Sequence, residues 1–293
     1  MRLIPIVLLT ALAGQPLSSA NLQIDHVTIA GRDLRTLQAG LRAVGIPTVF
    51  GGAHGNSVTE MAAASFPDGS YLEAIALQHG AKPEAVEKHE WARFLKTAGM
   101  PAAWALRAGD LGAEIARFRG AGLDLSAPVR AGRKRPDGVQ LEWETVDLGA
   151  ETRGTFFPFL IHDLTDRNRR AFINGKPLIT DFSGVARVVV AVRSLKEAVA
   201  RYRRAFGLPE PAEQNDGEFG ARLAAFPNEP VVLAEPLPSG SWISGRLNEF
   251  GEGPCAFILA ANGRRAAGSA TRWFGREVSW FDAGKLGWRL GFE

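Results

Sequence analysis

The sequence predicts an α+β protein built from repeated strand–helix–strands modules. Residues 25–34 and 186–195 are both short β-rich runs that lead through a turn into a helical stretch, and residues 64–68 resemble residues 224–228. Matches at a nearly constant offset indicate an internal duplication. A strand, a helix and then several strands, repeated in this order, is typical of α+β modules rather than of a doubly wound sheet.

Four segments have the composition of a strand that opens a module: residues 22–30, 102–108, 185–192 and 255–261. The first three are followed by apolar stripes with helical spacing, at residues 34–44, 111–118 and 195–206. The fourth is followed by Asn262-Gly263-Arg264-Arg265, which interrupts the pattern. We therefore expect the helix of the last module to be short or absent.

Strand-like runs separated by turns follow each predicted helix. Residues 57–65 and 70–77 flank Pro67-Asp68-Gly69, a good turn sequence. Residues 139–145 alternate strictly between apolar and polar side chains, which predicts a half-buried strand. Further strands are predicted at residues 156–161, 230–235, 277–281 and 286–292.

The polar stretch at residues 163–182 is the best candidate for a domain boundary. It divides the chain into a first pair of modules at residues 21–168 and a second, degenerate pair at residues 180–293.

The first twenty residues differ from the rest of the chain. Arg2 precedes an apolar run from Leu3 to Ala13, and Ser18-Ser19-Ala20 offers small residues at a cleavage site. This pattern predicts a signal peptide at residues 1–20 and an exported, periplasmic protein, with a buried N-terminal helix as the alternative. No other segment is long and apolar enough to span a membrane.

The composition argues against a nucleic-acid partner. The chain of 293 residues has 34 Lys and Arg against 31 Asp and Glu, and its Arg residues are scattered. Its single cysteine, Cys255, excludes an intramolecular disulfide and precedes an apolar run, so we expect a buried structural thiol. The sequence has no Gly-rich nucleotide loop and no Gly-x-Ser-x-Gly turn.

Several motifs in the first pair of modules, taken in order, match one known family. They are Asp25-His26-Val27 with Arg32-Asp33-Leu34, Gly51-Gly52-Ala53-His54, Gly69-Ser70-Tyr71-Leu72-Glu73, Ala103-Trp104-Ala105-Leu106-Arg107 with Gly109-Asp110-Leu111, Arg135-Pro136-Asp137-Gly138 with Leu141-Glu142-Trp143, and Phe157-Pro158-Phe159-Leu160-Ile161. The chain resembles the vicinal oxygen chelate superfamily, and more narrowly the glyoxalase-like domain. The second pair resembles the superfamily only in its pattern of elements.

The resemblance implies βαβββ modules that form curved mixed sheets with helices on the outside and a site in the concavity. Enzymes of the superfamily usually hold a divalent metal ion there, with His, Glu or Gln ligands from the first and last strands of the modules. Substrate oxygens take the open positions.

Strand alternation identifies the residues that would form this site. If Val27 and Ile29 face the helix, His26 faces the cavity, and Glu73 faces it from the last strand of the same module. His54, in a Gly-rich loop, is a third candidate ligand. An imidazole and a carboxylate suit zinc, iron, manganese or nickel.

The second module does not supply a matching pair. Ala103 aligns with His26, and Phe159 aligns with Glu73, so the expected set of ligands is incomplete. Arg107, predicted to point inward, would either anchor an acidic group of a substrate or form an internal salt bridge with Glu73 or Glu142. Trp143 is expected in the core.

These residues leave two main functions open. One is metal-dependent lyase, isomerase or dioxygenase chemistry on a small oxygen-rich substrate, with Glu73 and Arg107 as catalytic residues and with His26, His54 and Glu73 on the metal. The other is metal-free binding or sequestration of a small molecule, as in bleomycin-resistance proteins. A third reading makes the second pair of modules structural or a homodimer surface, because of Trp273, Trp280 and Trp288.

Overall fold

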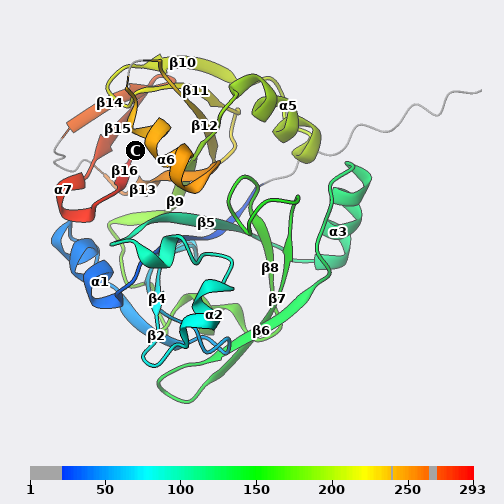
Figure 1. Ribbon diagram of the computed structural model, residues 1–293, viewed down its shortest axis with the longest axis vertical. Coiled ribbons are helices and arrows are strands. Elements are labelled where there is room, and N and C mark those ends of the chain that lie inside the picture. The colour runs from blue at the N-terminus through cyan, green and yellow to red at the C-terminus, as the bar shows by residue number, and fades with distance from the viewer. Residues whose placement is uncertain (1–21, 239, 264–268) are drawn as a thin grey trace, which may run out of the picture.

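The computed structural model describes residues 22–238, 240–263 and 269–293, which form two eight-stranded mixed sheets and several helices (Figure 1). The strands of the first sheet are β1 (Ile24–Ala30), β2 (Val49–Ala53), β3 (Thr59–Ser65), β4 (Tyr71–Leu77), β5 (Met100–Arg107), β6 (Val129–Lys134), β7 (Gln140–Asp147) and β8 (Phe159–Asp163). Those of the second sheet are β9 (Phe182–Ala191), β10 (Ala212–Asp216), β11 (Ala221–Ala225), β12 (Val231–Pro236), β13 (Gly253–Ala261), β14 (Ser269–Trp273), β15 (Arg276–Trp280) and β16 (Arg289–Phe292).

The helices are α1 (Leu34–Ala43), α2 (Pro83–Glu87), α3 (Leu111–Gly120), α4 (Arg167–Ala171), α5 (Leu195–Phe206), α6 (Trp242–Phe250) and α7 (Ala283–Leu286), with a 3₁₀ turn at Phe94–Lys96. The helices that follow the opening strands, α1, α3 and α5, begin alike. The side chains of Asp33, Asp110 and Ser194 each accept a hydrogen bond from a backbone N–H three residues later. Such caps satisfy a donor that the first turn leaves free.

The two sheets have the same strand order, position by position. The first runs β2-β3-β4-β1-β5-β8-β7-β6 and the second runs β10-β11-β12-β9-β13-β16-β15-β14. Each half of a sheet is one module, so the predicted fold of βαβββ modules in curved mixed sheets with outer helices is confirmed. No helix lies between β13 and β14 in the part of the chain that is described, as expected for the last module.

One core joins the two sheets. Val27 and Trp104 on β1 and β5 belong to the same buried cluster as Val188 and Phe257 on β9 and β13. The sheets therefore pack back to back through their central strands, and Figure 1 shows β5 and β9 at the boundary between the two halves. The concave faces point away from this shared core, and each concave face has a buried cluster of its own.

The first sheet is nearly a closed barrel. Its two edge strands, β2 and β6, meet just beyond β2, where His54 and Arg133 form an isolated antiparallel bridge. The Gly55 N–H also donates to the carbonyl of Gly132 at 3.3 Å. The curvature follows from this contact, which brings residues about eighty positions apart in sequence to one rim.

Several sequence expectations need correction. The four edge strands β2, β6, β10 and β14 were not predicted, because they have little apolar alternation. The polar stretch after β8, predicted as a domain boundary, also contains α4 and the buried Arg170. The three tryptophans proposed for a dimer surface, Trp273, Trp280 and Trp288, are all buried.

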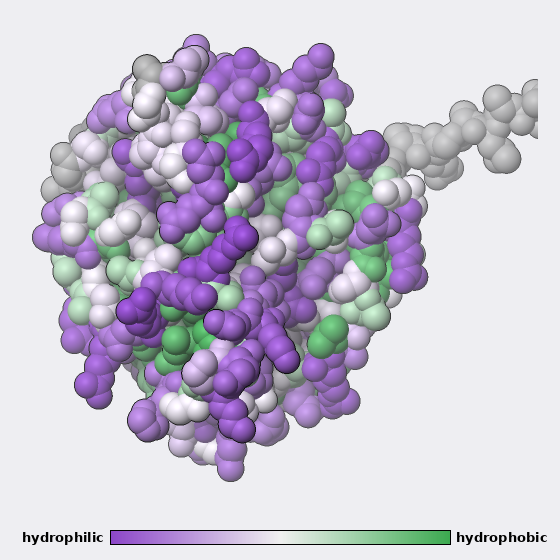
Figure 2. All heavy atoms as spheres, viewed as in Figure 1, coloured by the Kyte–Doolittle hydropathy of each residue, from purple (hydrophilic) through white to green (hydrophobic). Residues whose placement is uncertain are grey.

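The remaining expectations concern the surface and the chain start. Large exposed apolar side chains in the described residues are scattered, at Phe50, Val129 and Leu164, and the face in Figure 2 is mostly hydrophilic. A homodimer therefore stays a prediction. The predicted signal peptide lies outside the described residues. No helix among those that are described has both the length and the apolar character needed to cross a bilayer. Cys255 is a buried free thiol, as predicted.

Candidate functional site

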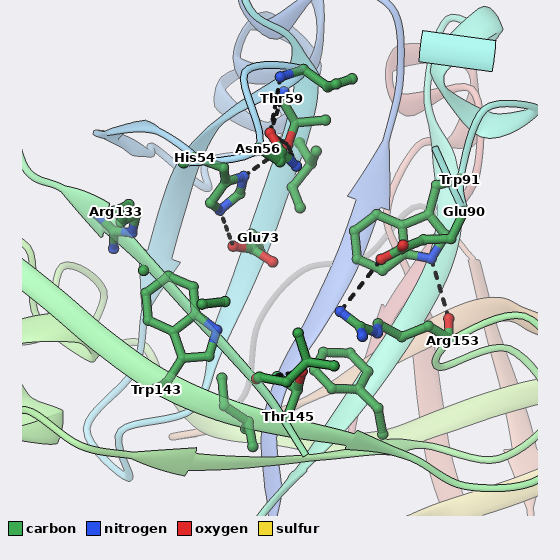
Figure 3. Close-up of a pocket in the computed structure, with 18 of the residues that line it drawn as sticks. His54, Asn56, Thr59, Glu73, Glu90, Trp91, Arg133, Trp143, Thr145 and Arg153 are labelled. Carbon is green, nitrogen blue, oxygen red and sulfur yellow. Dashed lines mark hydrogen bonds and ion pairs between the residues drawn. The ribbon is translucent and has the colours of Figure 1, made fainter. Parts of the chain in front are cut away.

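A cavity of about 1000 Å³ occupies the concave face of the first sheet. Of the residues predicted for the site, His26, His54 and Glu73 all line it, and Arg107 does not. Figure 3 shows the cavity from its side, with His54 and Glu73 on one wall and Arg153 and Trp91 on the opposite wall. A cavity of this size can hold a small organic molecule.

The pairing of β1 with β4 places His26 and Glu73 side by side. Thr28 is the register partner of Glu73 across these parallel strands, and His26 precedes Thr28 by two residues on the same face. The Nε2 atom of His26 lies 3.5 Å from a Glu73 carboxylate oxygen, and the Thr28 hydroxyl donates to the same oxygen at 3.3 Å. Val27 and Ile29 face the shared core, so the predicted alternation is confirmed.

A bulge in β1 gives His26 an acidic partner from the adjacent residue. The register with β5 shifts between Ile24 and His26, so Asp25 has no partner there. Neighbouring side chains of a regular strand point to opposite faces, but here the Asp25 carboxylate lies 2.7 Å from Nδ1 of His26. The sequence did not reveal this contact, because a bulge depends on the pairing of two distant segments.

Asp25 is fully buried and is held as an anion by arginines. Arg170 on α4 donates from two guanidinium nitrogens to the two Asp25 oxygens, each at 2.9 Å, and Arg167 also pairs with Asp25. Burial alone would raise the pKa of Asp25, but the charge of Arg170 and the contact with His26 hold it well below its usual value.

An ionised carboxylate can only accept hydrogen bonds, so Nδ1 of His26 carries a proton. In the neutral imidazole the lone pair is therefore on Nε2, which faces Glu73.

His54 approaches Glu73 from the other side. It lies at the turn between β2 and β3, where its Nδ1 is 2.9 Å from the Thr59 hydroxyl and its Nε2 is 3.9 Å from the second Glu73 oxygen. Burial lowers the pKa of His54 to about 4, although the charge of Glu73 opposes this shift. His54 is therefore a neutral imidazole at pH 7, and Glu73 lies between two imidazole rings.

Arg107 does not reach the cavity. Its Nη2 donates to the backbone carbonyl of Asp68 at 3.3 Å, and its Nε lies 3.9 Å from Asp25. Neither of the two predicted ion pairs, with Glu73 or with Glu142, is present. Arg107 lies at the end of β5, where its guanidinium extends past the rim of the concave face toward the turn before β4.

The structure brings other side chains into the cavity that the sequence did not assign to it. Arg133 on β6 is only 3% exposed and lines the cavity beside His54. Trp143 on β7 is buried in the hydrophobic cluster of the concave face, as predicted, and it also forms part of the cavity wall. Arg153, which pairs with Asp147 at 2.7 Å, forms part of the wall as well. Arg133 belongs to a basic run of the sequence, but only the closure of β6 against β2 turns it inward.

The donor types of His26, His54 and Glu73 fit a divalent transition-metal ion: two imidazoles and one carboxylate can hold such an ion with open positions. In the structure they form two pairs that share Glu73, one with His26 and one with His54. Among the described residues, no group of three or more His, Cys, Asp or Glu side chains is arranged as a metal site. The set of donors is thus chemically suitable and geometrically incomplete.

At the position equivalent to Glu73, the second module contributes an apolar side chain. The register of β5 with β8 pairs Ala105 with Phe159, just as β1 with β4 pairs Thr28 with Glu73. Phe159 therefore takes the place equivalent to Glu73, as the sequence alignment predicted. Its ring packs edge-on against the His26 ring, with centroids 5.5 Å apart. No further donor comes from this module at that position.

Fold and concave site together define a member of the vicinal oxygen chelate superfamily. The family model of the glyoxalase-like domain matches residues 24–187, more than half of the chain, so the chain belongs to the glyoxalase-like domain family. No curated protein matches the sequence.

Solved structures agree with the fold. A hypothetical protein from Staphylococcus aureus is 14% identical, with a TM-score of 0.65, and the match covers 93% of this chain and 99% of that one. A mutant of 4-hydroxymandelate synthase from Streptomyces coelicolor is 16% identical, with a TM-score of 0.53, and the match covers 83% of this chain and 71% of that one. At these identities the likeness shows the fold alone.

Proposed function

We propose that this protein binds a small oxygen-rich molecule in the cavity of its first sheet, next to Glu73. The observation that carries the proposal is the cavity itself. It is about 1000 Å³ in volume, and polar groups from β1, β4 and the β2–β3 turn converge on one of its walls. Concave sites of this kind, with a few convergent polar groups, are the usual places for small ligands.

A second candidate, metal-dependent chemistry, is favoured by the surroundings of Glu73. Its two oxygens face Nε2 of His26 at 3.5 Å and Nε2 of His54 at 3.9 Å. His26 also donates to a buried carboxylate, an arrangement that orients histidines on metal ions. A bound divalent ion would supply Lewis-acid stabilisation of negative charge on a substrate oxygen. His26, His54 and Glu73 would hold it, and lyase, isomerase or dioxygenase chemistry would follow.

Ligand binding tests the first proposal. Methylglyoxal and catechol are titrated into the chain from Asn21 onward, with the unfolding temperature and the fluorescence of Trp91 and Trp143 as readouts. We expect at least one of them to bind to the wild-type protein, and binding to weaken in Glu73→Gln. The control is Glu114→Gln, which changes an ion pair outside the cavity. If neither compound binds, or if both variants behave alike, the cavity is not the proposed site.

Metal analysis separates the two candidates. The same chain, purified without chelator and without a metal-binding tag, is examined by mass spectrometry. About one transition-metal ion per chain, lost in Glu73→Gln while the unfolding temperature is kept, would support metal-dependent chemistry. A protein that stays metal-free after reconstitution would leave binding without a metal. Glu142→Gln is the matched control, since Glu142 lines the cavity but pairs with Arg130.

A further inference from the structure

The cavity contains a buried cation that has no acidic partner. Arg133 is 3% exposed, and none of its nitrogens lies within 4.0 Å of a carboxylate oxygen in the described part of the chain. The other three arginines that line the cavity are all paired: Arg130 with Glu142, Arg153 with Asp147, and Arg170 with Asp25. Lys88, which also lines it, is exposed to water.

An uncompensated buried charge is costly, so Arg133 stands apart from its neighbours. Burial lowers the pKa of Arg133, and the charges of Tyr71 and Glu73 oppose this shift. Guanidinium groups remain charged in proteins all the same. The cavity therefore keeps one positive charge that no side chain neutralises at close range.

The guanidinium is held in a fixed orientation by the backbone. Its Nη1 donates to the carbonyl of Gly51, which lies at the register shift of β2 against β3. The absence of a side chain on Gly51 leaves room for this contact, since a Cβ there would lie 3.1 Å from Nη1. Nε and Nη2 make no hydrogen bond within the described residues, and together they form the side of the fork that suits a carboxylate.

We propose that Arg133 binds the carboxylate of the ligand, and that the natural ligand of the cavity is a small carboxylic acid. This inference rests on the proposed function of the cavity. A single buried cation matches a monoanion better than a phosphate dianion. The carboxylate would lie on the β6 side, near Trp143 (Figure 3), and the rest of the molecule would extend toward Glu73 on β4.

The first test compares acids with their amides on the wild-type protein. The probes are benzoate, phenylacetate and pyruvate, each against its amide, with inorganic phosphate as a further arm, all followed by protein-observed NMR. We expect at least one acid to bind at least about tenfold more tightly than its amide, as is typical of a charge-assisted hydrogen bond. Equal binding of acid and amide, no binding of any acid, or preferential binding of phosphate would each overturn the proposal.

The second test uses variants of the anchor. Arg133→Gln should weaken binding of the acid by about tenfold or more and leave binding of the amide unchanged, while Arg133→Lys, which keeps the charge but loses the fork, should lie between. Arg130→Gln is the control, because Arg130 lines the same cavity but is exposed and paired. Unchanged acid binding in a folded Arg133→Gln would also overturn the assignment.

These tests distinguish a failure of the carboxylate assignment from a failure of the proposed function of the cavity. Methylglyoxal and catechol are uncharged, so their Glu73-dependent binding does not require Arg133. If they bind and the acids do not, only the carboxylate assignment fails. If no probe of either kind binds, both the assignment and the proposed function fail.

Discussion

The two halves of this molecule share a strand order but use their concave faces differently. In the first sheet the concave face surrounds a cavity of about 1000 Å³ lined by charged and polar groups together with apolar ones. In the second, a cluster of aromatic side chains fills the same face, with Phe219, Trp273 and Trp280 all 4% exposed or less. The backbone arrangement therefore permits a site without requiring one, and a few side chains decide which half has it.

Equivalent positions show how the difference arises. The turn between β2 and β3 carries His54, whereas the turn between β10 and β11 carries Phe219. The pairing of β9 with β12 sets Val189 against Val232, where β1 and β4 have Thr28 and Glu73. Polar groups that line the cavity of the first half are thus replaced in the second half by apolar groups that pack against one another.

The largest expected difference between the two halves is in the stability lost when one aromatic ring is removed from each concave face. Phe219 lies within 5.5 Å, centroid to centroid, of three tryptophan rings, whereas Phe159 borders the open cavity. We expect Phe219→Ala to lower the free energy of unfolding by about 4 kcal/mol. Phe159→Ala should cost less, about 3 kcal/mol, because one side of its ring borders the cavity. Urea denaturation measures both, and equal losses would mean that the first concave face is packed as tightly as the second.

The next effect concerns charge. Asp25→Asn removes the anion that Arg170 and His26 contact, and should lower the free energy of unfolding by about 3 kcal/mol. Among the described residues, Arg170 then keeps only Asp163 as an acidic partner. In the second half, Glu293→Gln breaks the more accessible pair with Arg187 and should cost about 1 kcal/mol. In the alignment of the two repeats, Ala186 of the second half corresponds to Asp25 of the first, so the second half lacks this buried anion. If both variants lower the free energy of unfolding equally, the ionic network of the first half contributes no more to stability than the ion pair of the second half.

A third expected effect is a pH dependence that arises from His54 in the first half. His54 has a pKa of about 4 in the folded protein and about 6.5 when unfolded. Between these values the unfolded chain binds more protons, so stability falls as pH is lowered from 6.5 toward 4 and is constant above. We expect a loss of about 3 kcal/mol across this window in chelator-treated protein. It should shrink in His54→Gln and persist in His79→Gln, which changes an exposed residue.

His54 is not the sole group that titrates or carries charge there. Glu73, Arg133, His89 and His26 all act on it, and the pKa of His89 is also lowered by burial. Some pH dependence will therefore remain in His54→Gln. An unchanged profile in that variant would show that burial of His54 is not its source.

The sequence predicted the part of this site that local periodicity controls. Alternation along β1 and β4 placed His26 and Glu73 on the concave face, and the repeat placed Phe159 opposite Glu73. It missed Asp25 and Arg133, because a bulge and the closure of two edge strands turn them toward the site. Both devices depend on contacts between segments far apart in the chain, which no local pattern contains.

Arg107 was predicted to lie in the site but does not line the cavity. Counting alternate residues along β5 directs it inward, but it is the last residue of the strand, and its long side chain reaches the backbone of Asp68 instead. The polar stretch after β8 was predicted only as a domain boundary. Its residue Arg170 is buried against Asp25 and supports the residue next to His26, a role that the sequence did not reveal.

The core shared by the two convex faces has a consequence for how such a protein changes over generations. The second half covers the back of β1 and β5, and that task depends on residues such as Val188 and Phe257, not on anything in its own concavity. The inner face of the second half can therefore change without altering the contacts that cover β1 and β5, whereas its outer face cannot. A duplicated module pair can in this way lose its own site and still be retained, as the scaffold against which the other pair keeps its shape.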